Sequence, residues 1–202
     1  MRTVKVVESI DISAPRPEVF KIIANCDRRL QLSPLWGTGE IEDISPDFPQ
    51  EGSHYHVKLK ANEGILEEYV TIVTSFSPNQ KFAYRLTSKR QPQATWTVQD
   101  IAQGTRLIYQ EEFLIDEAGE DEFVQSVRKV VQDWLGNTKR YAELRGGWWQ
   151  PLVKWGVDRY LLPLRVDQRR VIFLLLAWQA ISCLALLALA LGWGTARLLG
   201  LM

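Results

Sequence analysis

Few side chains in this sequence are arranged for catalysis, and Glu111 is the first candidate. Strand alternation places it on the same face as Leu107, Tyr109 and Phe113, so its carboxyl group is expected to face an apolar interior. A carboxyl group there could orient a ligand hydroxyl or carbonyl, or act as an acid or base with a raised pKa. It could equally lie where that face opens to water, and both alternatives stay open.

The two histidines, His54 and His56, lie two residues apart and therefore share one face of a predicted strand. Such a pair could begin a metal site, but Lys58 and Lys60 share that face and repel cations. We therefore expect a solvated strand face, with no metal and no cofactor. The sequence also lacks a phosphate loop, a dinucleotide fingerprint and a Cys-x-x-Cys pair, so a nucleotide enzyme or hydrolase is not expected.

The elements that would position Glu111 are mostly strands. Pro15 is expected to open one short helix and Asn25 a second, whereas a longer apolar stripe predicts a helix over 121–144. Alternating apolar residues between turn signals predict seven strands, over 3–12, 37–44, 53–61, 65–76, 81–89, 94–101 and 105–115. The pattern predicts an α+β fold in which a curved antiparallel sheet is wrapped on the long C-terminal helix.

Large aromatic side chains are expected to gather between this sheet and the long helix. Aromatic walls with few hydroxyls suit a flat or chain-like hydrophobic ligand. The alternative is that the same side chains fill the space and leave a dry core. The candidate cavity residues are Tyr55, Tyr69, Tyr84, Trp96, Tyr109, Glu111, Phe113 and Trp134.

The arginine pair Arg28 and Arg29 falls in a predicted loop and is expected to be solvated.

The opening residues VESIDISAPRPEVFKIIANCDRRLQLSPLW carry a family resemblance, through Ser13-Ala14-Pro15, Val19-Phe20 and Trp36. Together with the element order, they resemble START-like (SRPBCC) helix-grip domains over 3–145. The resemblance implies a domain that holds an apolar ligand between sheet and long helix. Such families include lipid-transfer domains, polyketide cyclases and aromatases, and coenzyme Q-binding proteins, so the fold alone does not choose a function.

The C-terminal part has a different character from this domain. The chain has 202 residues and no net charge, yet 1–145 carries net −4 and 146–202 net +4. Residues 171–191 contain no charge and would form a helix of roughly 32 Å, close to the thickness of a bilayer core. We therefore expect a single transmembrane helix over 171–193 and a short tail over 194–202. Arg169 and Arg170 precede this span, which predicts a tail-anchored protein with its domain in the cytoplasm.

Residues 146–170 are expected to form an amphipathic interfacial linker, because apolar residues recur at helical spacing. The alternative is that this stripe docks on the soluble domain. Small residues Ala188, Gly192 and Ala196 recur every four positions and could pack against a partner transmembrane helix. The residues expected at the membrane interface are Trp148, Trp149, Trp155, Arg169, Arg170 and Trp193.

These features favour a membrane-tethered, non-enzymatic binding protein for a hydrophobic small molecule such as a lipid, quinone, isoprenoid or pigment. Its other expected partners are membrane lipids. One alternative is an accessory or assembly subunit of a larger membrane complex. Another is a cyclase or aromatase type of enzyme, with Glu111 and a cavity tyrosine as acid and base. A nucleic-acid binder is not expected, because the long domain has no basic excess.

Overall fold

The structure is a computed structural model that describes residues 2–35, 39–61, 64–88, 90–115, 120–164 and 166–198. The chain forms two compact units, Met1–Pro163 and Leu164–Met202.

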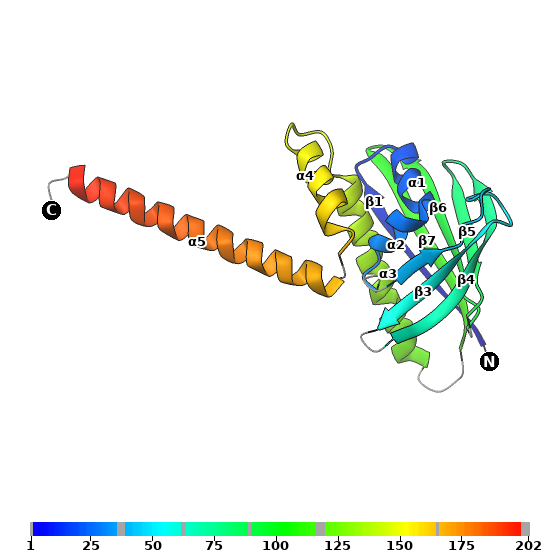
Figure 1. Ribbon diagram of the computed structural model, residues 1–202. Coiled ribbons are helices and arrows are strands. Elements are labelled where there is room, and N and C mark those ends of the chain that lie inside the picture. The colour runs from blue at the N-terminus through cyan, green and yellow to red at the C-terminus, as the bar shows by residue number, and fades with distance from the viewer. Residues whose placement is uncertain are drawn as a thin grey trace. The chain divides into compact units, whose positions relative to one another are not determined.

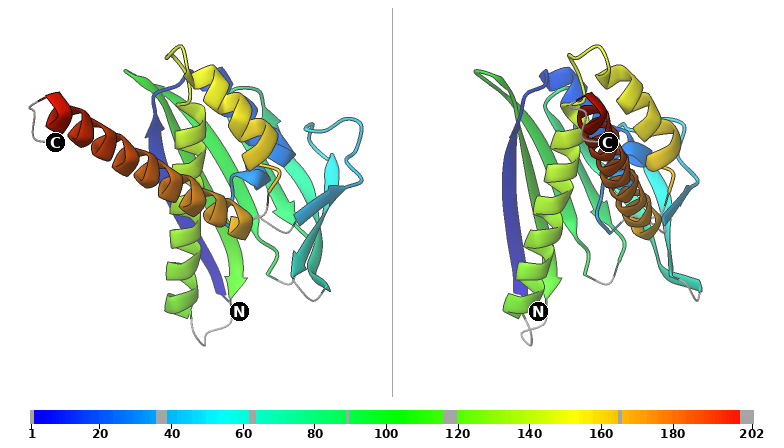
Figure 2. Two further views of the ribbon diagram at one scale, coloured as in Figure 1. Left: turned by 60° about the vertical axis from the view of Figure 1, so that its left-hand side comes forward. Right: turned by 90° about the vertical axis from the view of Figure 1, so that its left-hand side faces the viewer.

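The first unit is built on one seven-stranded antiparallel sheet, as predicted (Figures 1 and 2). Its strand order is β1-β7-β6-β5-β4-β3-β2, so the first strand of the chain pairs with the last. The strands are β1 (Arg2–Ile12), β2 (Gly39–Glu42), β3 (His54–Ala61), β4 (Gly64–Ser77), β5 (Lys81–Leu86), β6 (Gln93–Ile101) and β7 (Gly104–Ile115). β5 ends earlier than the expected position 89, because the chain turns through Gln91, which has a positive φ of 44°, just before Pro92.

The helices of the first unit cover the sheet on one side. α1 (Arg16–Ala24) follows Pro15, and α2 (Cys26–Gln31) is capped by Asn25, whose side-chain oxygen accepts from the backbone N–H of Arg28 at 2.8 Å. The long helix α3 (Glu120–Ala142) crosses the same face of the sheet (Figure 2). Its buried residues Val131, Trp134 and Leu135 pack into the main core. The helix-grip architecture expected from the sequence is thus confirmed.

The stretch after α3 belongs to the first compact unit. It forms α4 (Gln150–Gly156) and the π-helical turn η1 (Val157–Leu161). Leu162 is buried in the main core, and one carboxylate oxygen of Asp158 accepts from Arg28 at 2.5 Å and from the Tyr141 hydroxyl at 2.8 Å. This stretch therefore contacts the sheet domain through Asp158 and Leu162, whereas its apolar residues Leu152 and Tyr160 are exposed.

The other side of α4 and η1 is rich in exposed aromatic residues. Trp148 is 92 % exposed, and Trp149, Trp155 and Tyr160 are exposed as well. Trp155 and Tyr160 lie edge to face with ring centroids 5.6 Å apart. The interfacial assignment of this side stays a prediction.

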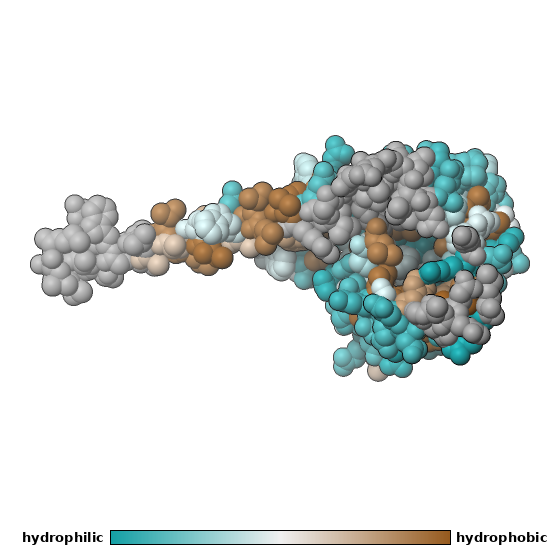
Figure 3. All heavy atoms as spheres, turned by 90° about the horizontal axis from the view of Figure 1, so that it is seen from below, coloured by the Kyte–Doolittle hydropathy of each residue, from teal (hydrophilic) through white to brown (hydrophobic). Residues whose placement is uncertain are grey.

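The second unit contains one long helix, α5 (Val166–Leu198), which includes the whole apolar run expected to span a membrane. Its apolar side chains in the described part are exposed, and Leu174 and Trp178 are each 71 % exposed (Figure 3). Within the part of the chain that the structure describes, no helix is both long and apolar enough to cross a membrane. The expected span is therefore not supported. The side chains of Gly192, Trp193 and Ala196 lie outside the described residues, as does that of Arg170.

Candidate functional site

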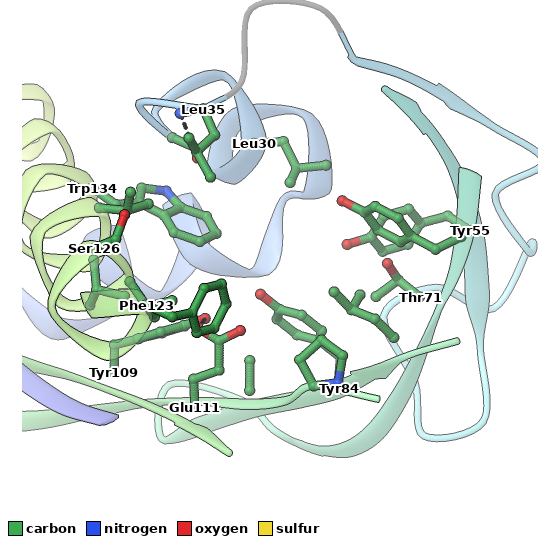
Figure 4. Close-up of a pocket in the computed structure, with 18 residues that line it drawn as sticks. Leu30, Leu35, Tyr55, Thr71, Tyr84, Tyr109, Glu111, Phe123, Ser126 and Trp134 are labelled. Carbon is green, nitrogen blue, oxygen red and sulfur yellow. Dashed lines mark hydrogen bonds between the residues drawn. The ribbon is translucent and has the colours of Figure 1, made fainter. Parts of the chain in front are cut away.

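A pocket of about 340 Å³ lies between the sheet, α3 and the segment around α2 (Figure 4). This volume is in the range of small-molecule sites, so the aromatic side chains do not fill the interior completely. The wall is mainly apolar, with hydroxyl groups and one carboxyl group set into it. It is formed by Leu30, Ser33, Leu35, Tyr55, Tyr69, Thr71, Tyr84, Leu86, Pro92, Ala94, Tyr109, Glu111, Phe123, Ser126, Val127, Val130, Val131 and Trp134.

The structure brings most of the predicted cavity residues together. Tyr55, Tyr69, Tyr84, Tyr109, Glu111 and Trp134 line the pocket. Trp96 does not line it and is fully buried against the rings of Tyr109 and Trp134, with centroids 4.5 and 5.0 Å away. Phe113 packs instead in a separate cluster, edge to face with Phe123 at 5.4 Å. Alternation along a strand shows which face a side chain lies on. It does not show whether a side chain on that face lines the pocket or lies outside it.

Glu111 faces the pocket from β7, as its strand parity predicted (Figure 4). The hydroxyl group of Tyr109, two residues earlier on the same face, donates a hydrogen bond to Glu111 Oε2 at 3.0 Å. Burial raises the pKa of the Glu111 carboxyl, and the Tyr109 hydrogen bond opposes that rise only partly. Burial likewise raises the pKa values of Tyr84 and Tyr109 well above the usual range. The pocket therefore favours neutral forms of its acidic groups.

Arg29 is the main correction to the sequence analysis, because it is not solvated. It is 1 % exposed, and its guanidinium donates to Tyr55 Oη at 2.6 Å and to the carbonyl oxygen of Ile23. The guanidinium lies 4.6 Å from the ring centre of Phe82 and 5.1 Å from that of Tyr84. Such distances are typical of cation–π contacts. No local sequence signal distinguishes this arginine from its half-buried neighbour.

The indole of Trp134 binds the backbone of Arg29. Its Nε1 donates to the Arg29 carbonyl oxygen at 2.8 Å, which links α3 to α2 next to the pocket.

Thr71 is a pocket residue that the sequence did not predict. It pairs directly with Tyr55 across β3 and β4, is 1 % exposed and lines the pocket, and within the described part of the chain its hydroxyl has no hydrogen-bond partner.

The histidine pair has a third neighbour that the sequence analysis did not include. Asp43, with a positive φ of 50°, brings its carboxylate 3.6 Å from His56 Nε2. One ligand atom from each of Asp43, His54 and His56 lies within 4.8 Å of the others. Lys58, expected to repel cations there, donates instead to Glu42 at 2.6 Å.

The comparison with protein families gives a match over residues 3–143, to the family described as polyketide cyclase / dehydrase and lipid transport. The chain belongs to this family. The match covers the sheet apart from Arg2 and all of α3, and therefore every residue that lines the pocket. A search of curated proteins gives no match.

Solved structures with the same fold are only distantly similar in sequence. Ara h 8.0201 has a TM-score of 0.56 at 13% identity, over 70% of this chain and 98% of that chain. The polyketide cyclase-like protein Cgl2372 from Corynebacterium glutamicum has a TM-score of 0.51 at 20% identity, over 71% and 93%. The di-domain aromatase/cyclase BexL has a TM-score of 0.55 at 18% identity, over 71% of this chain and 51% of BexL. These likenesses establish the fold alone.

Proposed function

We propose that the chain binds a hydrophobic small molecule in the pocket between the sheet and α3, without transforming it. The observation that carries this proposal is a cavity of about 340 Å³ with walls mainly of aromatic and aliphatic side chains. Burying apolar ligand surface there gains roughly 25 cal/mol per Å². Candidate ligands are a lipid, quinone, isoprenoid or pigment.

A cavity-filling variant tests this proposal. Val127 lines the pocket from α3, so Val127→Trp should fill part of the cavity and abolish uptake of the neutral dye N-phenyl-1-naphthylamine. Lys129→Trp, an exposed position of the same helix, is the matched control and should bind the dye like the native chain. Equal dye binding by both variants and the native chain would contradict the proposal.

Extraction in mild detergent identifies the natural ligand and tests the accessory-subunit alternative. Mass spectrometry of apolar molecules that copurify with the native chain, but not with Val127→Trp, should reveal the occupant. Partner chains recovered in stoichiometric amounts, with an empty pocket, would instead favour an assembly subunit.

A second candidate function is an enzyme of the cyclase or aromatase type. The observation that favours it is Glu111, a pocket-facing carboxyl group with a raised pKa and a tyrosine hydroxyl bonded to it. The fold of BexL, an aromatase/cyclase, is consistent with it. Glu111→Gln should then abolish turnover of a bound polyketide while ligand binding is retained. Equal loss of binding and turnover would argue against a catalytic carboxyl group.

We further propose that α5 attaches the chain to a membrane, with the first unit on the cytoplasmic side. The proposal rests on the uncharged stretch 171–191 and on the exposure of its described apolar side chains, which is unfavourable in water. Ile181→Arg combined with Leu184→Arg should release the chain from lipid vesicles in a flotation assay, because each arginine costs about 2.5–3.5 kcal/mol in a bilayer centre. Gln125→Arg on α3 is the control, and unchanged flotation of the double variant would contradict attachment through α5.

A further inference from the structure

Arg29 is a buried charge, and no buried carboxylate among the described residues balances it. Among the residues that the structure describes, no carboxylate forms an ion pair with its guanidinium, and its Nε atom is buried without a hydrogen-bond partner. Guanidinium groups stay protonated in proteins, and burying an unpaired charge is costly. The cation–π contacts with Phe82 and Tyr84 offset only part of that cost.

Tyr55 transmits this charge to the pocket. Its hydroxyl oxygen accepts a hydrogen bond from Arg29 NH2 at 2.6 Å, so the hydroxyl hydrogen is free for another acceptor. Tyr55 also lines the pocket, and Figure 4 shows its hydroxyl end directed into the cavity. A hydroxyl polarised by a cation is a stronger donor than a neutral one.

Thr71 supplies a second hydroxyl on the same part of the wall. Its side chain stands beside Tyr55, because the two residues are directly paired across β3 and β4. The Thr71 hydroxyl is buried and faces the pocket, and it has no hydrogen-bond partner among the residues described. A buried polar group in this position is expected to find its partner in a ligand or in water.

We propose that Tyr55 and Thr71, with Arg29 behind them, bind an anionic oxygen of the ligand, such as a carboxylate. The inference rests on the proposed binding function and narrows its ligand to an apolar molecule with an acidic group at one end. The carboxyl group of Glu111 faces the same pocket from β7. Because burial disfavours its ionised form, repulsion of a bound anion is reduced.

Two dyes with the same ring skeleton test this proposal on the full chain in mild detergent. 1-Anilinonaphthalene-8-sulfonate is anionic, whereas N-phenyl-1-naphthylamine lacks the sulfonate. The dye fluorescence measured with Val127→Trp, whose cavity is filled, is subtracted from that of each other protein. The remaining fluorescence reports dye bound in the pocket. Tyr55→Phe and Thr71→Val should each weaken binding of the anionic dye about tenfold and leave binding of the neutral dye unchanged. Tyr141→Phe removes a hydroxyl outside this pocket and is the matched control.

The outcomes separate this inference from the proposed function. Loss of anionic-dye binding alone supports the site. Equal weakening of both dyes, or no weakening of either, overturns the anion site while the apolar pocket stands. Failure of the native chain to bind either dye overturns the pocket proposal itself. Thermal unfolding of each variant confirms that a loss of binding does not come from unfolding.

Discussion

Glu111 shows how burial sets the charge state of a single side chain in this domain. The carboxyl group faces the pocket, and its loss of hydration raises its pKa more than the Tyr109 hydroxyl lowers it. An acid whose pKa is higher in the folded than in the unfolded chain stabilises the fold only when protonated. That stabilisation is complete below the unfolded pKa and is lost as the pH rises through the folded pKa.

We therefore expect Glu111→Gln to stabilise the domain at neutral pH. Glutamine keeps an oxygen that can accept from Tyr109 and carries no charge, so the cost of an ionised buried carboxyl disappears. Urea unfolding should show a higher free energy of unfolding for the variant at pH 7 and little difference at pH 4. Glu51→Gln, at an exposed position, is the control. A variant less stable than the native chain at pH 7 would contradict the assigned environment of Glu111.

Trp134→Phe should destabilise the domain by about 1–3 kcal/mol, because the buried carbonyl oxygen of Arg29 would lose its indole donor. Trp155→Phe changes a largely exposed indole and should cost less than about 0.5 kcal/mol. Chemical denaturation of both variants measures the difference. Equal effects would mean that the Trp134 hydrogen bond contributes nothing to stability.

At the scale of elements, the turn between β6 and β7 determines how closely β1 can approach. Gly104 has a φ of +135°, and a Cβ atom at this position would lie 2.1 Å from the carbonyl oxygen of Ile12. Only glycine allows both this backbone conformation and this contact. The pairing of the first strand with the last therefore depends on one residue without a side chain.

Gly104→Ala should cost about 2–4 kcal/mol of folding free energy, since alanine brings both strain and a backbone clash. Gly52→Ala is the matched control: its φ is +87°, but a Cβ atom there meets nothing within 4 Å, so about 1 kcal/mol is expected. Thermal melting of the two variants gives the comparison. A Gly104 variant as stable as the Gly52 variant would refute the close approach of β1.

Asp158 links the segment of α4 and η1 to the domain, in addition to the buried side chain of Leu162. Asp158 accepts from Arg28 and from the Tyr141 hydroxyl, and burial together with this hydrogen bond raises the pKa of Tyr141 to about 12. Asp158→Ala should therefore cost about 1–3 kcal/mol and speed amide exchange over 150–161. Asp100→Ala breaks an exposed ion pair with Arg16 and should cost under about 1 kcal/mol. Unchanged exchange in the Asp158 variant would show that the segment is held by other contacts.

At the scale of the whole molecule, the boundary of the compact domain lies after the docked segment. The first unit runs to Pro163, and Leu162 is buried in the same core as α1 and α3. We expect a chain of residues 1–163 to unfold in one cooperative transition. A chain of residues 1–145 should be less stable by about 3 kcal/mol, because core surface around Tyr141 and Ala142 becomes exposed. Equal stability of the two truncated chains, measured by urea unfolding, would contradict this boundary.

Local patterns in the sequence predicted the strands and the long helix, because alternation and helical periodicity are properties of neighbouring residues. The same parity correctly directed Glu111 and Tyr109 toward the pocket. It did not show that Phe113 lies away from the pocket wall, since parity gives the face of a strand but not the neighbours of a side chain, and Phe113 packs against Phe123 of α3. It also gave no information on Asp43, which meets His56 only through the pairing of β2 with β3.

The sequence by itself determined the family and the apolar nature of the last segment, because both reside in residue types and short spacings. Only the tertiary structure decided that a cavity remains among the aromatic side chains and that Arg29 is buried beside it. Arg28 and Arg29 are identical in type and adjacent in sequence, yet one pairs with Asp158 and the other with Tyr55. Their difference arises from contacts with residues far away in the chain, and these exist only after the sheet and α3 have packed.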